Sequence, residues 1–232
     1  FCALDFSDLR FCGAGGMALS SSIAKRWEHL TGCEIFEGYG LTECSPVVSV
    51  NLPGKVRLGT VGELVPETEI MAVDDAGQAV GIGERGEACI RGPQVMLGYW
   101  QQAEATRDAI TEDGWFRTGD YVEISEDGYI TVVDRKKDMI LVSGFNVFPT
   151  EIEDWVNQHP DVLESAAIGV PDERRGERVK LYVVRKAETL SVEEITEHCA
   201  LGLTAYKMPK EIVFADELPK SLIGKILRKE LK

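Results

Sequence analysis

The first part of the chain combines short apolar runs with one helical stripe. Apolar residues at Ile23, Trp27 and Leu30 recur at the spacing of one helix face. Serines precede this stripe and Gly32 follows it, as expected for the start and the end of a helix. The pattern predicts a strand, a glycine-rich turn, a helix and a second strand, at residues 9–12, 13–16, about 18–30 and 33–36.

Shorter alternating runs occupy the middle of the chain, from about residue 59 to residue 134. Turn sequences such as Asp75-Ala76-Gly77 separate them, and one helix is expected near 103–110. Alternation of apolar and polar residues with period two is typical of half-buried strands. The pattern predicts a small antiparallel sheet or barrel, with strands that include 69–73, 87–90 and 129–133.

The pattern changes again after the charged stretch 134–138, which we interpret as a linker. A helix is expected to open at Pro149, because proline is well tolerated in a first helical turn. Ser191 and Glu194 match the capping box Ser-x-x-Glu at the start of a later helix. The remaining predicted elements are strands at 139–142, 166–170 and 179–184 and a helix over 191–203. The fold class is therefore mixed, with α/β and α+β parts.

Composition narrows the class of protein. The chain is 44% hydrophobic and 28% charged, which is a globular balance and not that of a disordered chain. A net charge of −14 repels phosphate backbones and argues against general nucleic-acid binding. By contrast, residues 207–232 hold seven Lys or Arg and four Asp or Glu, and such a local basic patch suits a small anionic ligand.

The six cysteines form no C-x-x-C pair, and most lie in apolar runs. We therefore expect buried free thiols in a reducing cytoplasm and neither a disulfide framework nor a zinc site. No apolar run approaches the roughly 20 residues of a membrane-spanning helix.

Two glycine patterns resemble dinucleotide-binding fingerprints. The pattern at 81–86 precedes a strand, and we interpret it as a turn. The pattern at 13–18 lies between a strand and a helix, and Glu37 follows near the distance of a ribose-binding acid. A nicotinamide-binding oxidoreductase is therefore a competing hypothesis, although the hairpins that follow do not continue a Rossmann sheet.

Three short motifs carry oxygen or nitrogen groups suited to a nucleotide. Tyr39 lies between Gly38 and Gly40 and can expose its ring to a flat base. The hydroxyl of Thr42 and the carboxylate of Glu43 suit phosphate and Mg²⁺.

The other two motifs each place a charged side chain after a glycine. Asp120 can accept both hydroxyls of a ribose, and Lys225 can neutralise charge on phosphorus. Each motif alone also has a structural interpretation as a turn, a cap or a solvated lysine.

Together, the order and separation of these motifs resemble the C-terminal part of the adenylate-forming superfamily. The runs 39–43, 116–120, 134–147 and 219–225 carry the resemblance. The run 92–100 and the run 134–153 are most similar to the bacterial long-chain fatty acid–CoA ligases in that superfamily.

The resemblance implies ATP, Mg²⁺ and coenzyme A as reactants, and a two-step reaction through an acyl-adenylate with release of AMP. It implies that Gly15, Gly16 and Tyr39, with its flanking glycines, frame the adenine. Thr42 would contact the α-phosphate, and Glu43 would hold Mg²⁺.

For the second half of the chain, the resemblance implies that Asp120 and Arg135 bind the ribose. Lys225 would bridge the α-phosphate and the substrate carboxylate. Lys137 would be the hinge about which a small C-terminal domain rotates between the two steps. Gly144 would lie beside the pantetheine arm of coenzyme A.

The resemblance also implies a domain plan. Residues 1–136 would end the large domain, as a βαβ piece (1–58) and a β-barrel subdomain (59–136), and residues 137–232 would form the mobile domain. The phosphate-binding Ser/Thr/Gly-rich loop and acyl tunnel would belong to a missing N-terminal lobe, so we expect a fragment that is inactive alone.

Several functions stay open beside a cytoplasmic long-chain fatty acid–CoA ligase. Medium-chain or aryl-acid CoA ligases and acyl-carrier-protein ligases would share every motif. A nicotinamide-binding oxidoreductase and a non-catalytic protein descended from a ligase are alternatives of other classes. Contact with the inner face of the membrane is a further open point.

Overall fold

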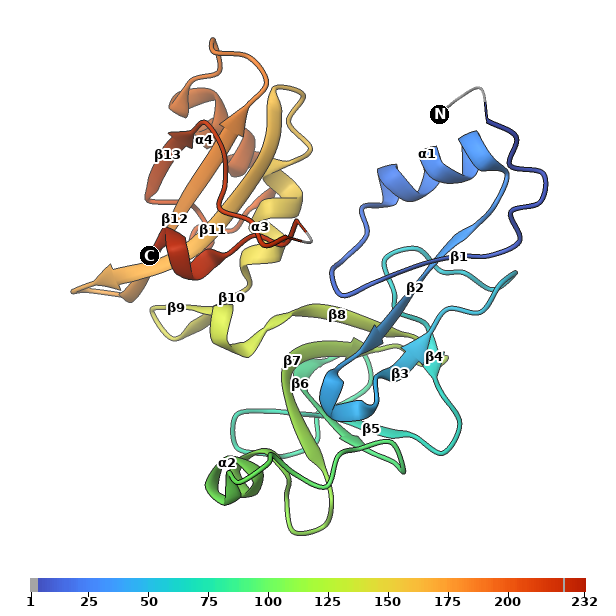
Figure 1. Cartoon of the computed structure of the whole chain (residues 1–232). Coiled ribbons are helices and arrows are strands. Elements are labelled where there is room, and N and C mark those ends of the chain that lie inside the picture. Colours follow the sequence, from blue (N-terminus) through green and yellow to red (C-terminus); the bar gives the residue numbers. More distant parts are fainter. Residues whose placement is uncertain (1–3, 223) are drawn as a thin grey trace. The chain divides into compact units, whose positions relative to one another are not determined.

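The computed structural model describes residues 4–222 and 224–232. Its contacts divide the chain into two compact units, Phe1–Val132 and Val133–Lys232 (Figure 1). The division falls inside strand β8 (Ile130–Arg135), shortly before the predicted hinge residue Lys137. The predicted linker is therefore wrong in its first part. Asp134 is buried, and its Oδ2 accepts the Thr150 N–H at 2.9 Å, so this residue belongs to the packed second unit.

The first unit opens with a βαβ arrangement followed by antiparallel strands. Its sheet has the order β1-β2-β3-β4, in which β1 and β2 are parallel and the other pairs are antiparallel. Helix α1 ends at Gly32, which adopts a positive φ of 68°. The elements are β1 (Cys12–Gly15), α1 (Ser21–Thr31), β2 (Ile35–Gly40), a 3-10 turn η1 (Thr42–Cys44), β3 (Val47–Val50) and β4 (Glu63–Leu64).

Two predicted positions in this sheet are wrong. Gly13, Ala14 and Gly15, which we expected to form a turn after the first strand, belong to β1 itself. A Cβ atom on Gly13 would lie 3.1 Å from the ring of Phe36, so the missing side chain lets β1 pack closely against that ring. Strand β2 begins and ends later than predicted and includes Tyr39, because its backbone pairs with β1 on one side and β3 on the other.

A second sheet in the first unit confirms the predicted alternating strands. Its order is β5-β6-β7-β8, and its edge strand β8 also bonds to residues 61–62, since the Val61 N–H donates to the Ile130 carbonyl at 2.8 Å. Ala72, Ala88, Val122 and Ile130 form the centre of its core. The elements are β5 (Glu69–Val73), β6 (Arg85–Arg91), α2 (Ala103–Ala109), β7 (Phe116–Ile124) and β8.

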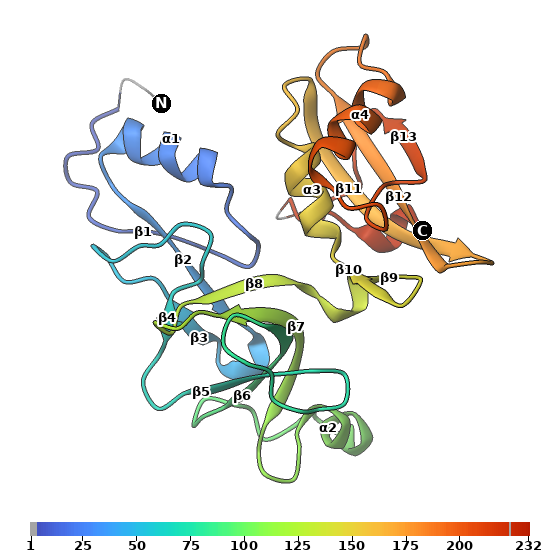
Figure 2. The ribbon, with the colours of Figure 1, turned by 180° about the vertical axis from the view of Figure 1, so that it is seen from behind.

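The second unit is a five-stranded sheet with two helices. Its order is β10-β9-β12-β11, and β13 pairs in parallel with β12. Figure 2 shows α3 and α4 against β11 and β12, and Ile152, Ile195 and Leu181 are fully buried in the shared core. The elements are η2 (Lys136–Asp138), β9 (Ile140–Val142), β10 (Phe145–Val147), α3 (Pro149–Val156), β11 (Val162–Asp172), β12 (Gly176–Arg185), α4 (Val192–Gly202), β13 (Glu211–Ala215) and η3 (Arg228–Leu231).

Local sequence signals explain both helix starts in this unit. Pro149 occupies the first turn of α3, as predicted. The predicted capping box of α4 is confirmed, because Ser191 Oγ accepts the Glu194 N–H at 3.2 Å and the Glu194 carboxylate accepts the Ser191 N–H at 2.9 Å.

The cysteines within the described residues are free thiols, and all of these except Cys12 are buried. Burial raises the pKa of Cys199 to about 11, and burial with the charge of Glu43 raises that of Cys44 to about 11. Cys2 lies outside the described residues. Over 4–222 and 224–232, no helix is both long and apolar enough to cross a membrane.

Candidate functional site

A hydrogen bond joins two predicted site residues that lie 81 positions apart. The Tyr39 hydroxyl on β2 donates to Asp120 Oδ2 on β7 at 2.7 Å. Asp120 is 4% exposed, so its carboxylate is largely withdrawn from water. Burial, together with the negative charge of Asp120, raises the pKa of Tyr39 above its usual range. Tyr39 therefore stays a hydrogen-bond donor, and an aromatic ring and a carboxylate form one fixed pair.

Glycines keep the backbone around Tyr39 free of side chains. Gly15 on β1 is the parallel partner of Gly38 on β2, so two glycines lie side by side in the sheet. A Cβ atom on Gly40 would overlap the carbonyl oxygen of Pro46. Gly16 follows β1 with a φ of 83°, and a Cβ there would meet no atom within 4 Å. This bare strip of backbone can be approached closely by a flat ring.

The carboxylate of Asp120 is positioned from the second sheet. Its backbone N–H donates to Thr118 Oγ1 at 3.1 Å, and that hydroxyl donates to the Ala88 carbonyl at 2.9 Å. Between them, Gly119 adopts a φ of 70°, which favours glycine. The predicted glycine turn is therefore a kink within β7, and it places Asp120 beside Tyr39.

Thr42 and Glu43 lie together on the 3-10 turn η1, directly after β2. Thr42 is exposed, and Glu43 is half-buried. The Tyr99 hydroxyl donates to Glu43 Oε1 at 3.0 Å, and the Met96 N–H donates to the Glu43 carbonyl at 2.8 Å. The sequence motifs did not predict a role for Tyr99. It lies 56 positions from Glu43, and no local pattern connects residues so far apart.

The donor set around Glu43 fits Mg²⁺ that is shared with a nucleotide. Within the part of the chain that the structure describes, no group of three or more His, Cys, Asp or Glu side chains could hold a metal ion. Mg²⁺ is commonly held by one or two carboxylates together with substrate phosphates and water, and not by an all-protein cage. Glu43, with the neighbouring Thr42 hydroxyl, matches that pattern.

The other four predicted site residues belong to the second unit. Arg135 ends β8, and Lys137 lies exposed on the following turn η2. Lys225 follows Gly224, which has a φ of 83°, and the Lys225 N–H donates to Ser221 Oγ at 3.2 Å. Lys225 thus stands on a short, internally bonded loop ahead of η3.

Gly144 occupies the tip of the hairpin between β9 and β10. It forms a two-residue turn with Ser143, and their φ angles are 84° and 52°. Positive φ at both central residues is the geometry of a type I′ hairpin turn. A Cβ atom on Gly144 would meet nothing within 4 Å, so the tip is open to a ligand.

A buried ion network, which sequence reasoning also missed, connects the Lys225 segment to the rest of the second unit. Arg228 donates to Glu153 Oε2 at 2.7 Å, and it lies 3.9 Å from the Asp138 carboxylate on η2. Burial opposes the charge on Arg228, but Glu153, Asp134 and Asp138 together raise its pKa. The turn that carries Lys137 and the segment that carries Lys225 therefore share one anchor.

Glu37, which supported the nicotinamide hypothesis, has a structural role. Its Oε1 accepts the Leu19 N–H at 2.8 Å ahead of α1, and the residue is buried. The helix starts at Ser21 and not directly after the glycines, and β3 runs antiparallel to β2. In a dinucleotide-binding fingerprint, the glycine turn leads directly into the helix. The glycines at 13–16 do not have this arrangement, because α1 begins at Ser21.

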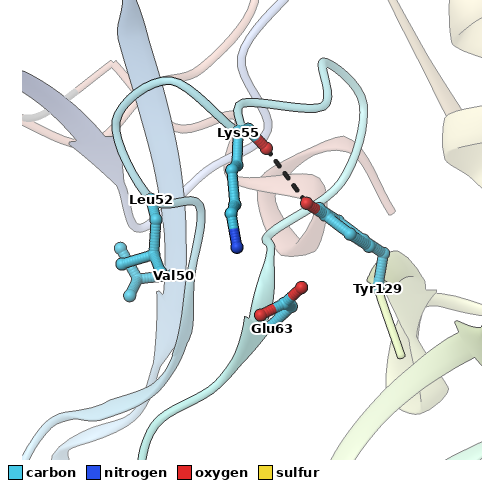
Figure 3. A pocket seen from close by; sticks show the side chains of 5 residues that line it. All are labelled: Val50, Leu52, Lys55, Glu63 and Tyr129. Atoms are coloured by element: carbon cyan, nitrogen blue, oxygen red, sulfur yellow. Dashed lines mark hydrogen bonds between the residues drawn. The ribbon is translucent and has the colours of Figure 1, made fainter. Parts of the chain in front are cut away.

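A small pocket in the first unit lies apart from the predicted residues. In Figure 3 the Lys55 side chain extends between Leu52 and Glu63, and the Tyr129 hydroxyl donates to the Lys55 carbonyl at 3.1 Å. Val50 completes the lining, and none of the predicted site residues contributes to it.

Two family models match the chain. The model of the AMP-binding enzyme matches residues 2–100, and the model of the AMP-binding enzyme C-terminal domain matches residues 151–225. The long-chain-fatty-acid–CoA ligase of Yersinia pestis is 54% identical over 233 residues, which cover 100% of this chain and 41% of that ligase.

Solved structures agree with the family models. ATP-bound MatB from Rhodopseudomonas palustris has a TM-score of 0.89 at 34% identity, over 95% of this chain and 44% of that one. The anthranilate CoA ligase AuaEII in complex with anthranoyl-AMP has a TM-score of 0.86 at 37% identity, over 100% of this chain and 45% of that one. The chain thus belongs to the adenylate-forming family of AMP-binding enzymes, and it spans about 41% of the length of its curated relatives.

Proposed function

We propose that the whole protein activates a long-chain fatty acid with ATP and transfers the acyl group to coenzyme A. The observation that carries the proposal is the hydrogen bond between Tyr39 and Asp120. It pairs an aromatic platform for a base with a carboxylate for the two ribose hydroxyls, as the binding of AMP requires. Relatives that align with 98–100% of the chain are named for this ligase activity.

In the first step, an oxygen of the fatty acid carboxylate attacks the α-phosphorus of ATP. The bond from that phosphorus to pyrophosphate breaks, and acyl-adenylate and pyrophosphate form. Thr42 contacts the α-phosphate, Glu43 is the ligand for Mg²⁺, and Lys225 neutralises charge between the phosphate and the carboxylate. When bound, Mg²⁺ supplies positive charge to the phosphate oxygens.

In the second step, the thiolate of coenzyme A attacks the acyl carbonyl carbon, and the bond to AMP breaks. Arg135 and Asp120 keep the ribose in place. A rotation about Lys137 exchanges the Lys225 segment for the Gly144 hairpin between the two steps, so one cavity serves both reactions. The open hairpin tip at Gly144 leaves room for the pantetheine arm.

The names of the similar ligases support a long-chain acid as the substrate. Medium-chain and aryl acids, and transfer to an acyl-carrier protein, would use the same residues. We place the reaction in the cytoplasm, with contact at the inner membrane face because a long-chain acid partitions into lipid.

Pyrophosphate release by the full-length protein tests the proposal. ATP, Mg²⁺ and acids from acetate to hexadecanoate are supplied without coenzyme A, and an aryl acid is included. Release that peaks with a long-chain acid supports the proposal. A peak with a short or aryl acid keeps the reaction and replaces the substrate. No release from folded protein, together with tighter binding of NADH than of an acyl-adenylate analogue, would favour the oxidoreductase alternative.

A further inference from the structure

The loop between β6 and α2, residues 92–102, forms two hydrogen bonds with Glu43. The Met96 N–H donates to the Glu43 carbonyl at 2.8 Å, and the Tyr99 hydroxyl donates to Glu43 Oε1 at 3.0 Å. One bond fixes the backbone of η1, and the other fixes the carboxylate. Together they restrict both the place and the rotation of this side chain.

The second carboxylate oxygen of Glu43 is left for a ligand. Over the described residues 4–222 and 224–232, Glu43 forms no ion pair, and its only side-chain hydrogen bond is the one from Tyr99 to Oε1. Buried charges are usually paired or bound to a metal ion, and Glu43 is already half-buried. This arrangement suits a carboxylate oxygen whose cation, Mg²⁺, binds together with the nucleotide.

Tyr99 is itself anchored from α2. Its N–H donates to Thr106 Oγ1 at 2.9 Å, and that hydroxyl donates to the Gln102 carbonyl at 2.9 Å. Gly98 has a φ of 148°, and a Cβ atom there would lie 2.7 Å from Thr106 Cγ2. The short helix α2 thus fixes the loop that carries the Tyr99 hydroxyl.

We propose that Tyr99 is the positioning residue for the metal-binding carboxylate: it holds Glu43 Oε1, so that Oε2 is the oxygen available to Mg²⁺. This inference rests on the proposed function, in which Glu43 is the Mg²⁺ ligand. Residues that orient a metal ligand commonly change metal affinity by about 10–100-fold when they are replaced. Tyr99 contributes through Glu43 and need not contact substrate.

The test measures the affinity of the full-length protein for Mn²⁺ in the presence of a non-hydrolysable ATP analogue. Electron paramagnetic resonance detects the bound and free Mn²⁺. Tyr99→Phe keeps the ring and removes the hydroxyl. We expect it to weaken Mn²⁺ binding by about 10-fold, with unchanged affinity for metal-free AMP and an unchanged melting temperature. Thr106→Val removes the acceptor of the Tyr99 N–H but keeps the Tyr99 hydroxyl. We expect this variant to weaken Mn²⁺ binding by less than Tyr99→Phe does.

The matched control is Tyr121→Phe, since the Tyr121 hydroxyl donates to Asp75 Oδ1 at the same 3.0 Å. Mn²⁺ affinity at the wild-type level in Tyr99→Phe, or an equal loss in Tyr121→Phe, would overturn the inference. Glu43→Gln tests the Mg²⁺ assignment of Glu43 separately from the role of Tyr99. If Glu43→Gln weakens Mn²⁺ binding and Tyr99→Phe does not, only the role of Tyr99 fails; if neither does, the metal assignment of Glu43 fails as well.

Discussion

At the scale of single residues, close backbone contact sets the strongest constraint at Gly40. This glycine ends β2 next to Tyr39, and the Leu41 N–H donates to the Pro46 carbonyl at 2.8 Å. A Cβ atom at position 40 would overlap that same carbonyl oxygen. The return of the chain from β2 to β3 therefore requires glycine.

We expect Gly40→Ala to lower the free energy of unfolding by about 1–3 kcal/mol, the usual cost of overpacking. Denaturant unfolding of the full-length protein measures it. Gly81→Ala is the control, because its Cβ would meet only the flexible Glu84 side chain, at 3.2 Å. Equal stability of the two variants would contradict the steric argument.

A surface ion pair gives a residue-scale dependence on pH. Arg57 hydrogen-bonds to Asp127, lies 3.9 Å above the Tyr129 ring, and with Ser125 lowers the pKa of Asp127 below its ordinary value of 3.8. A carboxyl whose pKa is lower in the folded state stabilises the fold above its ordinary pKa, and this stabilisation is lost as the pH falls below it.

We therefore expect Arg57→Met to raise the pKa of Asp127 towards 3.8. Carboxyl NMR titration of the full-length protein measures this shift. The variant should be less stable than wild type near pH 7, with the difference shrinking at a pH well below 3.8. A stability difference that is constant over this range would show that the ion pair is not its source.

At the scale of elements, capping explains where α4 begins. Ser191 and Glu194 exchange two hydrogen bonds around the first turn. We expect Ser191→Ala to cost about 0.5–2 kcal/mol of stability, because one helical N–H loses its acceptor. Thermal unfolding measures it. Thr196→Ala on the exposed side of the same helix is the control, and its change should stay within about 0.5 kcal/mol. A larger loss in the control would reject capping as the cause.

At the scale of the whole molecule, the proposed reaction divides into two half-reactions that would depend on different parts of the chain. We expect Lys225→Ala to slow acyl-adenylate formation by at least about 100-fold, the usual cost of removing a charge-stabilising group. Transfer to coenzyme A from supplied acyl-adenylate should persist. Single-turnover assays of each half-reaction in the full-length enzyme separate the two.

The control for this prediction is Lys229→Ala, since Lys229 is exposed in the same C-terminal segment. It should leave both half-reactions near wild-type rates. Equal loss of both half-reactions in Lys225→Ala would contradict the proposed role and would point to a general disturbance of the second unit.

The sequence alone determined the elements whose signals are local. The helical stripe before Gly32, the alternation over 69–73, Pro149 and the capping box at Ser191 each predict an element that the structure contains. Such signals act within one or two turns of chain. The motif order also predicted the family, which the comparisons confirm.

Which distant residues come into contact depends on how the strands and helices pack. Tyr39 bonds to Asp120, Glu43 bonds to Tyr99, and Arg228 bonds to Glu153, over separations of 81, 56 and 75 residues. Each contact depends on strand register and on packing between elements, which local spacing does not specify. The same reason explains why the first strand includes Gly13 and Gly15. Pairing with β2 and packing against the Phe36 ring outweigh the local preference of glycine for turns.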